Sequence, residues 1–334
     1  MNKLFNYGRI FYHWRIGQTS KLPYVPEDIS VELTNTCNFR CAFCPQSDPE
    51  HFNIVTRSTL APDQARILVE KLRRGGVQTN VLLWTLDGEP FVNKEIGEIC
   101  VIAMEHGFDE FIFSTNGFFC TEDRLNELPQ DANYQLCVDF CANEALFEKH
   151  RGTRNSWGKV KANLEALLVN ERLSHIRLKV TDITSFDPDA VPTNTDSVSA
   201  LRNLFAASPH LNVASRVFHN ATGHVPGLKE KKREKANKYN LCPYPWTSMV
   251  IASNGDVVAC CRDLQHKTVL GNLFKQELVD IWNSEEYQNL RTALVEKDPD
   301  RMSACQGCDL PYDADKFRVA HLAKTAVNRL GILR

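Results

Sequence analysis

Three regularly spaced cysteines are the residues of this chain best suited to do chemistry. Cys37, Cys41 and Cys44 form a C-x3-C-x2-C pattern directly after a short apolar run. Such a run is typical of a strand that leads into a loop. Three thiolates on one loop can bind three irons of a cubic [4Fe–4S] cluster and leave one iron open. A zinc site would need a fourth ligand nearby, and the next candidate, His51, comes seven residues after Cys44.

The neighbours of these cysteines carry a family resemblance. Asn35 and Asn38 flank the first cysteine, and the aromatic Phe43 precedes the third. With these residues the loop resembles that of the radical S-adenosylmethionine (radical SAM) family. The resemblance implies that the open iron binds S-adenosylmethionine and that the reduced cluster cleaves it to a 5′-deoxyadenosyl radical.

The resemblance to the radical SAM family extends to motifs that follow the later predicted strands, where the family binds S-adenosylmethionine. The tetrapeptide at 87–90, Asp-Gly-Glu-Pro, matches the family's Gly-Gly-Glu-Pro motif except for Asp87, which tolerates a positive φ less well than Gly. Ordinary turns at 87–90 and 114–117, and a surface position for Arg151, are the alternatives. The resemblance assigns S-adenosylmethionine binding to Asp87, Gly88, Glu89, Pro90, Ser114, Thr115, Asn116, Asp139 and Arg151.

Polar residues follow the sixth predicted strand, where they would overhang the open end of a barrel. Arg216, His219 and Asn220 lie in this stretch and are candidates for substrate contact. Histidines in such positions are often structural, and that is the alternative for His219 and His224.

A second set of cysteines lies near the other end of the chain. Cys242, Cys260 and the Cys305/Cys308 pair could enclose a second iron–sulfur cluster or a zinc ion. Gly255, five residues before Cys260, completes a C-x12-G-x4-C pattern. This pattern resembles the shortened "twitch" form of the SPASM domain, which carries an auxiliary cluster in radical SAM enzymes. No cysteine follows Cys308, so the resemblance implies one auxiliary [4Fe–4S] cluster.

Cys261 adjoins Cys260, and neighbouring residues of a strand point to opposite faces. The glycine spacing selects Cys260 as the ligand. Cys261 is then either a packed thiol or a catalytic hydrogen-atom donor. The cysteines outside any motif are expected to be buried as small apolar groups: Cys100, Cys120, Cys137 and Cys141.

The strands and helices that must position these residues alternate along the sequence. Six short apolar strands alternate with five helical patterns, which predicts βαβ units and a parallel sheet. Periodicity alone leaves a doubly wound sheet open. The resemblance favours a partial (β/α)6 TIM-like barrel, in which the chemistry lies at the C-terminal strand ends. Expected strands after the first are 81–86, 111–115, 134–140, 176–183 and 211–218, and expected helices are 62–74, 96–106, 124–128, 160–168 and 198–205.

With the resemblance, we expect the chain to divide into an N-terminal extension (1–27), a radical SAM barrel (28–225), a charged linker (226–241) and an α+β SPASM/twitch domain (242–334). The last domain is expected to hold strands at 249–251 and 257–259, a single helix at 276–295 and a basic amphipathic helix at 316–330. The extension has interleaved basic and aromatic residues. We expect it to pack on the barrel, with a membrane-surface helix as the alternative.

Composition narrows the class of protein. The 334 residues are 43% hydrophobic and 24% charged with a net charge of −2, as in ordinary globular proteins. This net charge lacks the excess of basic residues that is typical of nucleic-acid-binding proteins. No apolar run is long enough to form a transmembrane segment. Twelve cysteines without an export signal favour metal or cluster binding in the reducing cytoplasm over disulfides.

The resemblance implies an oxidoreductase that removes a hydrogen atom from a small polar substrate, carbohydrate- or aminocyclitol-like, and passes the remaining electron to the auxiliary cluster. An electron donor such as flavodoxin or ferredoxin would reduce the first cluster. A radical SAM epimerase or peptide-modifying enzyme is the alternative, although the residues before the first strand are too few for a leader-binding domain. A non-enzymatic electron carrier or a zinc-stapled binding protein is the alternative of another class.

Overall fold

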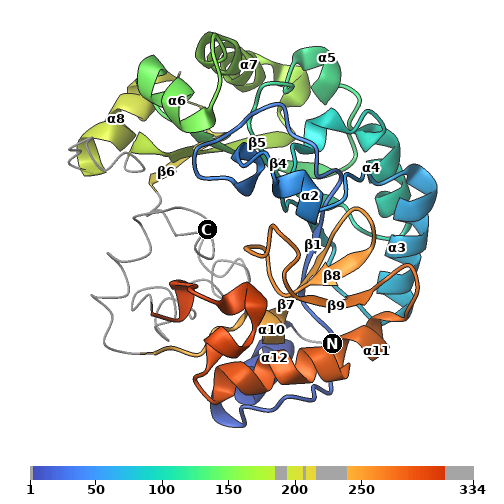
Figure 1. Cartoon of the computed structure of the whole chain (residues 1–334). Coiled ribbons are helices and arrows are strands. Elements are labelled where there is room, and N and C mark those ends of the chain that lie inside the picture. Colours follow the sequence, from blue (N-terminus) through green and yellow to red (C-terminus); the bar gives the residue numbers. More distant parts are fainter. Residues whose placement is uncertain (1–2, 185–193, 206–207, 216–238, 313–334) are drawn as a thin grey trace.

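The computed structural model describes residues 3–184, 194–205, 208–215 and 239–312. All of its named strands belong to one nine-stranded sheet with the order β6-β5-β4-β3-β2-β1-β7-β8-β9. The sheet curves into an arc, and helices α3, α4, α7 and α8 lie along its outer side (Figure 1). The strands are β1 (Asp28–Val31), β2 (Val81–Trp84), β3 (Glu110–Thr115), β4 (Asn133–Phe140), β5 (Ile176–Asp182), β6 (Leu211–Ser215), β7 (Ser248–Ile251), β8 (Asp256–Val258) and β9 (Val269–Asn272).

Local sequence explains where several helices begin. Pro62 opens α3, because a proline at the first helical turn loses no hydrogen bond. Thr121 and Asn143 accept hydrogen bonds from backbone N–H groups of the first turns of α5 and α6. The helices are α1 (Lys3–Phe11), α2 (His51–Ile54), α3 (Pro62–Arg74), α4 (Ile96–Glu105), α5 (Glu122–Leu125), α6 (Glu144–Arg151), α7 (Trp157–Val169), α8 (Asn194–Leu204), α10 (Tyr244–Thr247), α11 (Leu278–Trp282) and α12 (Glu285–Val295).

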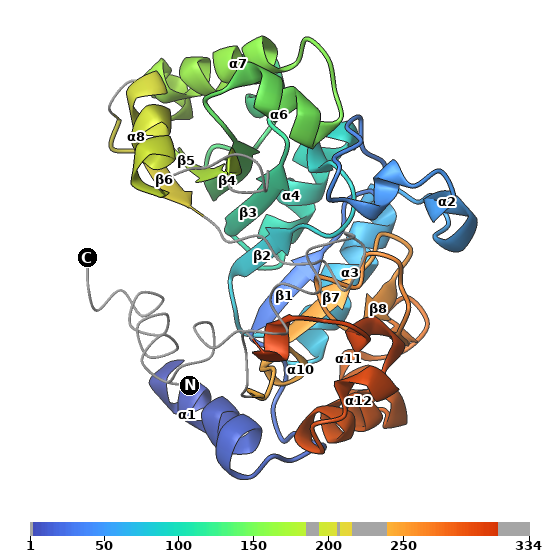
Figure 2. The same ribbon diagram turned by 60° about the vertical axis from the view of Figure 1, so that its left-hand side comes forward.

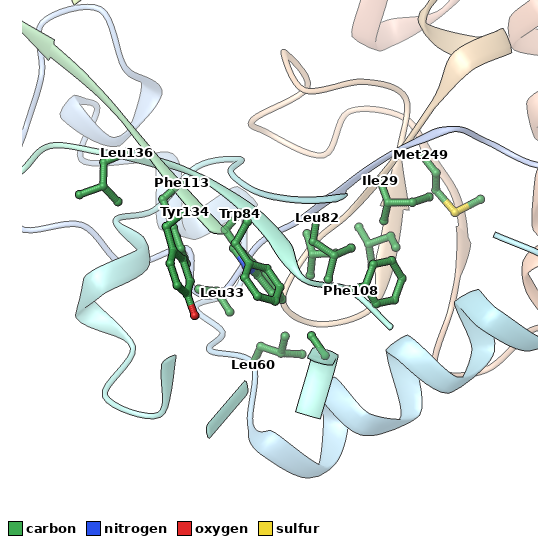
Figure 3. Packing of buried hydrophobic residues seen from close by; sticks show 14 of the residues in the cluster. Ile29, Leu33, Leu60, Leu82, Trp84, Phe108, Phe113, Tyr134, Leu136 and Met249 are labelled. Carbon is green, nitrogen blue, oxygen red and sulfur yellow. The ribbon is translucent and has the colours of Figure 1, made fainter. Parts of the chain in front are cut away.

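Strands β1 to β6 are parallel and run in chain order across the sheet, as a βα rhythm requires. Their outward-facing residues are large and apolar, and they form a core between the sheet and the helices (Figure 3). Phe111 stacks on Tyr134 with ring centroids 5.5 Å apart, and Trp84 stacks on Phe113 at 6.4 Å. The predicted partial barrel is therefore confirmed, and its helices are held by this aromatic core.

One row of residues on the opposite face of the sheet is polar. Ser114, Cys137, Lys179 and Asn212 are paired in register across four neighbouring strands. These residues are exposed or half-buried, whereas the residues before and after them along each strand are more deeply buried. Because alternate strand residues point to opposite faces, the inner side of the arc presents hydroxyl, thiol, amine and amide groups.

The C-terminal strands continue the barrel sheet, which the sequence did not predict. Strand β7 pairs in parallel with β1, with Ser30 opposite Val250, and β8 and β9 add antiparallel strands beyond it. Figure 2 shows β7 beside β1 with α10, α11 and α12 grouped next to them. The C-terminal region is thus joined to the strand that leads into the cysteine loop.

The N-terminal stretch packs on the body of the protein, as expected. Ile10 and Trp14 are buried, and Trp14 Nε1 donates a hydrogen bond to the carbonyl of Leu241. In the described part of the chain no helix is both long and apolar enough to cross a membrane.

Some expected elements were wrong in extent. The single helix expected at 276–295 is two helices, because Ser284 interrupts it and caps α12 by accepting a hydrogen bond from Tyr287 N. The helix expected at 124–128 is α5, which begins at Glu122. Strand β9 and helix α6 were not expected. The helix expected at 316–330 and the end of the strand expected at 211–218 lie outside the described residues.

Candidate active site and auxiliary cysteine pocket

The cysteine loop begins beyond the C-terminal end of β1, the end at which barrel chemistry occurs. Cys41 is buried, and Cys37 and Cys44 are half-buried. Cys44 N donates to the Cys41 carbonyl at 2.9 Å. Asn116, from the end of β3, donates to Asn38 Oδ1 at 2.8 Å and lies 3.8 Å from Cys37 Sγ. The loop is therefore held both by its own turns and by a neighbouring strand end.

Two glycines allow other segments to touch this loop. A Cβ atom on Gly88 would lie 1.9 Å from the Thr34 carbonyl oxygen, and one on Gly152 would lie 1.8 Å from that of Arg40. Gly152 also has a φ of 59°, a left-handed conformation that glycine adopts without strain. The glycines of the motifs at 87–90 and 151–152 thus let the backbone pack directly against the cysteine loop.

Glu89 joins the ends of β2 and β3. Its buried carboxylate accepts hydrogen bonds from Thr115 Oγ1 at 2.7 Å, Asn116 N at 2.6 Å and Phe91 N at 3.1 Å. Burial raises the pKa of this carboxyl, and the hydrogen bonds and the charge of Arg151 oppose the rise. Glu89 and Thr115 therefore brace the site, and Pro90 opens the short turn that follows.

Arg151 is buried behind the cysteine loop. Burial lowers its pKa, but the nearby Cys41, Asp139 and other acidic groups outweigh it, so the pKa is raised overall. Its guanidinium lies 5.5 Å from the Phe39 ring centroid, and its Nε has no hydrogen-bond partner in the described part of the chain. Asp139 is half-buried near the end of β4, and Ser114 lies exposed on the inner face of β3.

Asp87 forms a buried pair that the sequence did not reveal. Its φ is not positive, so the expected difficulty with an Asp in place of Gly does not arise. Asp87 Oδ2 lies 2.7 Å from His51 Nε2, and Oδ1 lies 3.9 Å from Cys44 Sγ. Gln46 Nε2 donates to the Asp87 carbonyl at 3.0 Å. The sequence offered His51 only as a distant candidate for a zinc ligand. His51 and Gln46 lie in a polar stretch without periodicity, so no sequence pattern predicts their contacts with Asp87.

Glu32 connects the cysteine loop to the C-terminal region. One carboxylate oxygen accepts a hydrogen bond from Asp87 N at 3.2 Å. The other accepts from Ser253 N at 3.1 Å and Ser253 Oγ at 2.7 Å, in the turn between β7 and β8. Burial raises the pKa of Glu32. A carboxylate in an apolar run, just before the loop, is the signal that could have identified this residue.

The second cysteine set shares one pocket. Cys242, Cys260, Cys305 and Cys308 line it together, whereas Cys261 is exposed and does not. This geometry favours Cys260 over Cys261 as a member of the set, and its role as a ligand stays a prediction. The rest of the lining is mostly apolar: Tyr244, Pro245, Ala259, Leu290, Leu294, Ala304, Leu310 and Pro311.

The donor chemistry of both sets suits iron–sulfur clusters. All twelve cysteines are free thiols. Burial raises the pKa of Cys37 and of Cys242 to about 12, so bound iron would supply the positive charge that favours their thiolates. In the described residues no three His, Cys, Asp or Glu side chains converge on a single metal ion. Cluster ligands need no such convergence, because each binds a different iron.

Two family models match this chain. The Radical SAM superfamily model matches residues 31–171, and SPASM, an iron–sulfur cluster-binding domain, matches residues 242–309. Residues 31–171 are therefore a Radical SAM domain, and residues 242–309 are a C-terminal SPASM domain. These domains define an enzyme that uses S-adenosylmethionine, a [4Fe–4S] cluster and auxiliary iron–sulfur chemistry, which confirms the cofactors expected from the sequence.

Characterised relatives resemble this chain to different extents. The S-adenosyl-L-methionine-dependent 2-deoxy-scyllo-inosamine dehydrogenase of Niallia circulans is 22% identical over 84% of this chain and 92% of that protein. A GTP 3′,8-cyclase of Xanthomonas axonopodis pv. citri (strain 306) is 26% identical, and the match spans 55% of this chain and 53% of the cyclase.

Solved structures share the fold. BtrN in complex with AdoMet and 2-DOIA has a TM-score of 0.56 at 20% identity, with 85% of this chain and 93% of BtrN covered. The structure of anSMEcpe with bound AdoMet has a TM-score of 0.58 at 12% identity, with 92% and 96% covered. Both likenesses support the barrel architecture. The substrate candidates Arg216, His219 and Asn220 lie outside the described residues.

Proposed function

We propose that this enzyme oxidises a small polar substrate, carbohydrate- or aminocyclitol-like, by radical dehydrogenation. The observation that carries the proposal is the match to the 2-deoxy-scyllo-inosamine dehydrogenase, which extends over 92% of that protein. The match to the GTP 3′,8-cyclase covers about half of each protein. It therefore supports a radical SAM domain in this chain but not a cyclase activity.

We assign the cluster that cleaves S-adenosylmethionine to Cys37, Cys41 and Cys44, and one auxiliary cluster to the second cysteine set. When bound, the first cluster together with S-adenosylmethionine would supply a 5′-deoxyadenosyl radical, and the second cluster would supply a one-electron acceptor. The nine residues named from the family motifs remain candidates for S-adenosylmethionine binding, and Asp87, Asn116 and Arg151 among them lie against the first loop. Among them Glu89 and Thr115 act by holding the strand ends together, because their polar atoms already bond to each other.

The polar row on the inner face of the arc supports a hydrophilic substrate. Ser114, Cys137 and Lys179 offer hydrogen-bonding groups in register on β3, β4 and β5. Oxidation of an alcohol to a ketone removes two hydrogen atoms in total. Hydrogen-atom abstraction removes the first as one proton and one electron; the second leaves as an electron to the acceptor and a proton to a base. Arg216, His219 and Asn220 remain candidates for substrate contact. Cys261 as a hydrogen-atom donor would serve only the epimerase alternative, because dehydrogenation returns no hydrogen atom to the substrate.

We further propose that a small external electron donor, such as flavodoxin or ferredoxin, reduces the first cluster and that the enzyme works in the cytoplasm. The free thiols favour a reducing compartment.

The test is an anaerobic assay of the reconstituted protein with S-adenosylmethionine, a reductant and 2-deoxy-scyllo-inosamine. We expect 5′-deoxyadenosine together with a product that has lost two hydrogens. Formation of an isomer that carries solvent deuterium would instead indicate an epimerase. The enzyme proposal fails if the wild-type protein forms no 5′-deoxyadenosine above the level of a Cys37→Ala variant.

A further inference from the structure

A buried arginine contacts two cysteines of the auxiliary pocket. Arg262 is only 5% exposed. Its backbone N–H donates to Cys260 Sγ at 3.4 Å, and its Nη1 lies 3.9 Å from Cys308 Sγ. The same Nη1 donates to Asp309 Oδ1 at 2.8 Å, and Asp309 is also buried. The guanidinium thus stands between a cysteine sulfur and the carboxylate of the next residue.

This arrangement has a defined electrostatic polarity. A guanidinium is always charged, and its charge acts strongly where water is excluded. Asp309 offsets the cost of burying that charge and fixes the position of the guanidinium. The positive end of the pair nevertheless faces the sulfur of Cys308. Positive charge and N–H donors at a ligand sulfur favour the reduced, more negative state of an iron–sulfur cluster.

We propose that Arg262 is a positioning residue that acts through Cys308 to raise the reduction potential of the auxiliary cluster. A higher potential makes that cluster a better acceptor for the electron that remains after hydrogen-atom abstraction. The inference rests on the proposed function for the presence of the cluster, but it concerns a property that can be measured without any substrate.

The experiment is an anaerobic redox titration of reconstituted full-length protein, followed by EPR of the reduced clusters. A variant with Cys37, Cys41 and Cys44 replaced by alanine identifies the auxiliary signal. In Arg262→Met we expect the reduction potential of the auxiliary cluster to fall. At a fixed solution potential, the ratio of reduced to oxidised auxiliary cluster should decrease at least tenfold. A tenfold change corresponds to about 59 mV for a one-electron couple.

Three further variants separate charge from structural damage. Asp309→Asn removes the opposing charge, so we expect the potential to rise. The double variant, Arg262→Met with Asp309→Asn, removes both charges of the buried pair, so it serves as a control if Arg262→Met alone misfolds. The potential of its auxiliary cluster should lie between those of the two single variants. Arg301→Gln is the matched control, because Arg301 pairs with Glu296 at the surface and its side chain is 45% exposed. It should leave the potential unchanged.

The outcomes are distinct. Opposite shifts in the two single variants support the role of Arg262. Equal potentials in the wild type, Arg262→Met and the double variant, with iron content retained, would overturn it while leaving the auxiliary cluster intact. Absence of iron from the variant that lacks the first three cysteines would refute the auxiliary cluster itself, and the inference with it.

Discussion

The two cysteine sets of this chain are built in opposite ways. The first occupies one short loop, residues 37–44, and segments from separate βα units pack against it through Gly88 and Gly152. The second draws its cysteines from three segments between residues 242 and 308 into a mostly apolar pocket. A short loop with three thiols leaves room for a ligand at the fourth iron, whereas four thiols around a pocket close it.

One charged group in contact with a cysteine sulfur differs in sign between the two sets, although the buried Arg151 also lies near Cys41 of the first set. A carboxylate oxygen of Asp87 lies 3.9 Å from Cys44 Sγ, and a guanidinium nitrogen of Arg262 lies 3.9 Å from Cys308 Sγ. Negative charge beside a cluster favours its oxidised state and positive charge its reduced state. The difference suits a first cluster that gives up an electron and a second that takes one.

The largest effect is expected from loss of a first-loop cysteine. Cys37→Ala should reduce 5′-deoxyadenosine formation to background while leaving the auxiliary cluster in place, because the two sets do not share a ligand. Cys100→Ala is the control, since Cys100 is buried in α4 among apolar residues. Chromatographic assay of 5′-deoxyadenosine and iron analysis measure both. Equal activity in the two variants would contradict the assignment of the first loop.

The close approach of Gly152 predicts the next largest effect. Gly152→Ala would place a Cβ atom against the Arg40 carbonyl at a positive φ. We expect a loss of stability of about 1–3 kcal/mol and weaker retention of the first cluster. Gly158→Ala is the matched control, because a Cβ there meets nothing within 4 Å in helix α7. Urea denaturation of both variants is the measurement, and equal midpoints would argue against the bracing role.

The variant Asp87→Asn tests whether the negative charge beside the first cysteine set lowers the reduction potential of the first cluster. Without the carboxylate we expect the potential of the first cluster to rise, opposite in sign to the change in Arg262→Met. Redox titration with EPR detection measures it. A fall in potential, or a shift in the auxiliary signal instead, would show that the charge of Asp87 does not set the first cluster apart.

The sequence predicted the parts of this fold that have local patterns. Alternating apolar runs located β2 to β5 and their helices, and cysteine spacing located both sites. The pairing of β7 with β1 had no local signal, since it joins Ser30 to Val250 across most of the chain. The His51–Asp87 pair was missed for the same reason: its members are 36 residues apart, and hydrogen bonds between loops leave no periodicity.

The smallest effect is expected at the surface between α3 and α11. The hydrogen bond and charge of Arg74 lower the pKa of Glu277 below its ordinary value of 4.5. A lowered carboxyl pKa adds stability that is present above the ordinary value and is lost as pH falls through the folded pKa. Glu277→Gln should therefore be slightly less stable at neutral pH and no different in strong acid. Thermal melts at several pH values measure this, and a difference that persists at low pH would contradict it.

The most direct test of the account is the iron and sulfide content of anaerobically reconstituted protein. With two [4Fe–4S] clusters we expect about eight iron and eight sulfide per wild-type chain. About four of each should remain when Cys37, Cys41 and Cys44 are replaced by alanine, and about four when Cys242, Cys260, Cys305 and Cys308 are replaced instead. A wild-type value near four, or a loss of all iron from either variant, would contradict the assignment of two independent clusters.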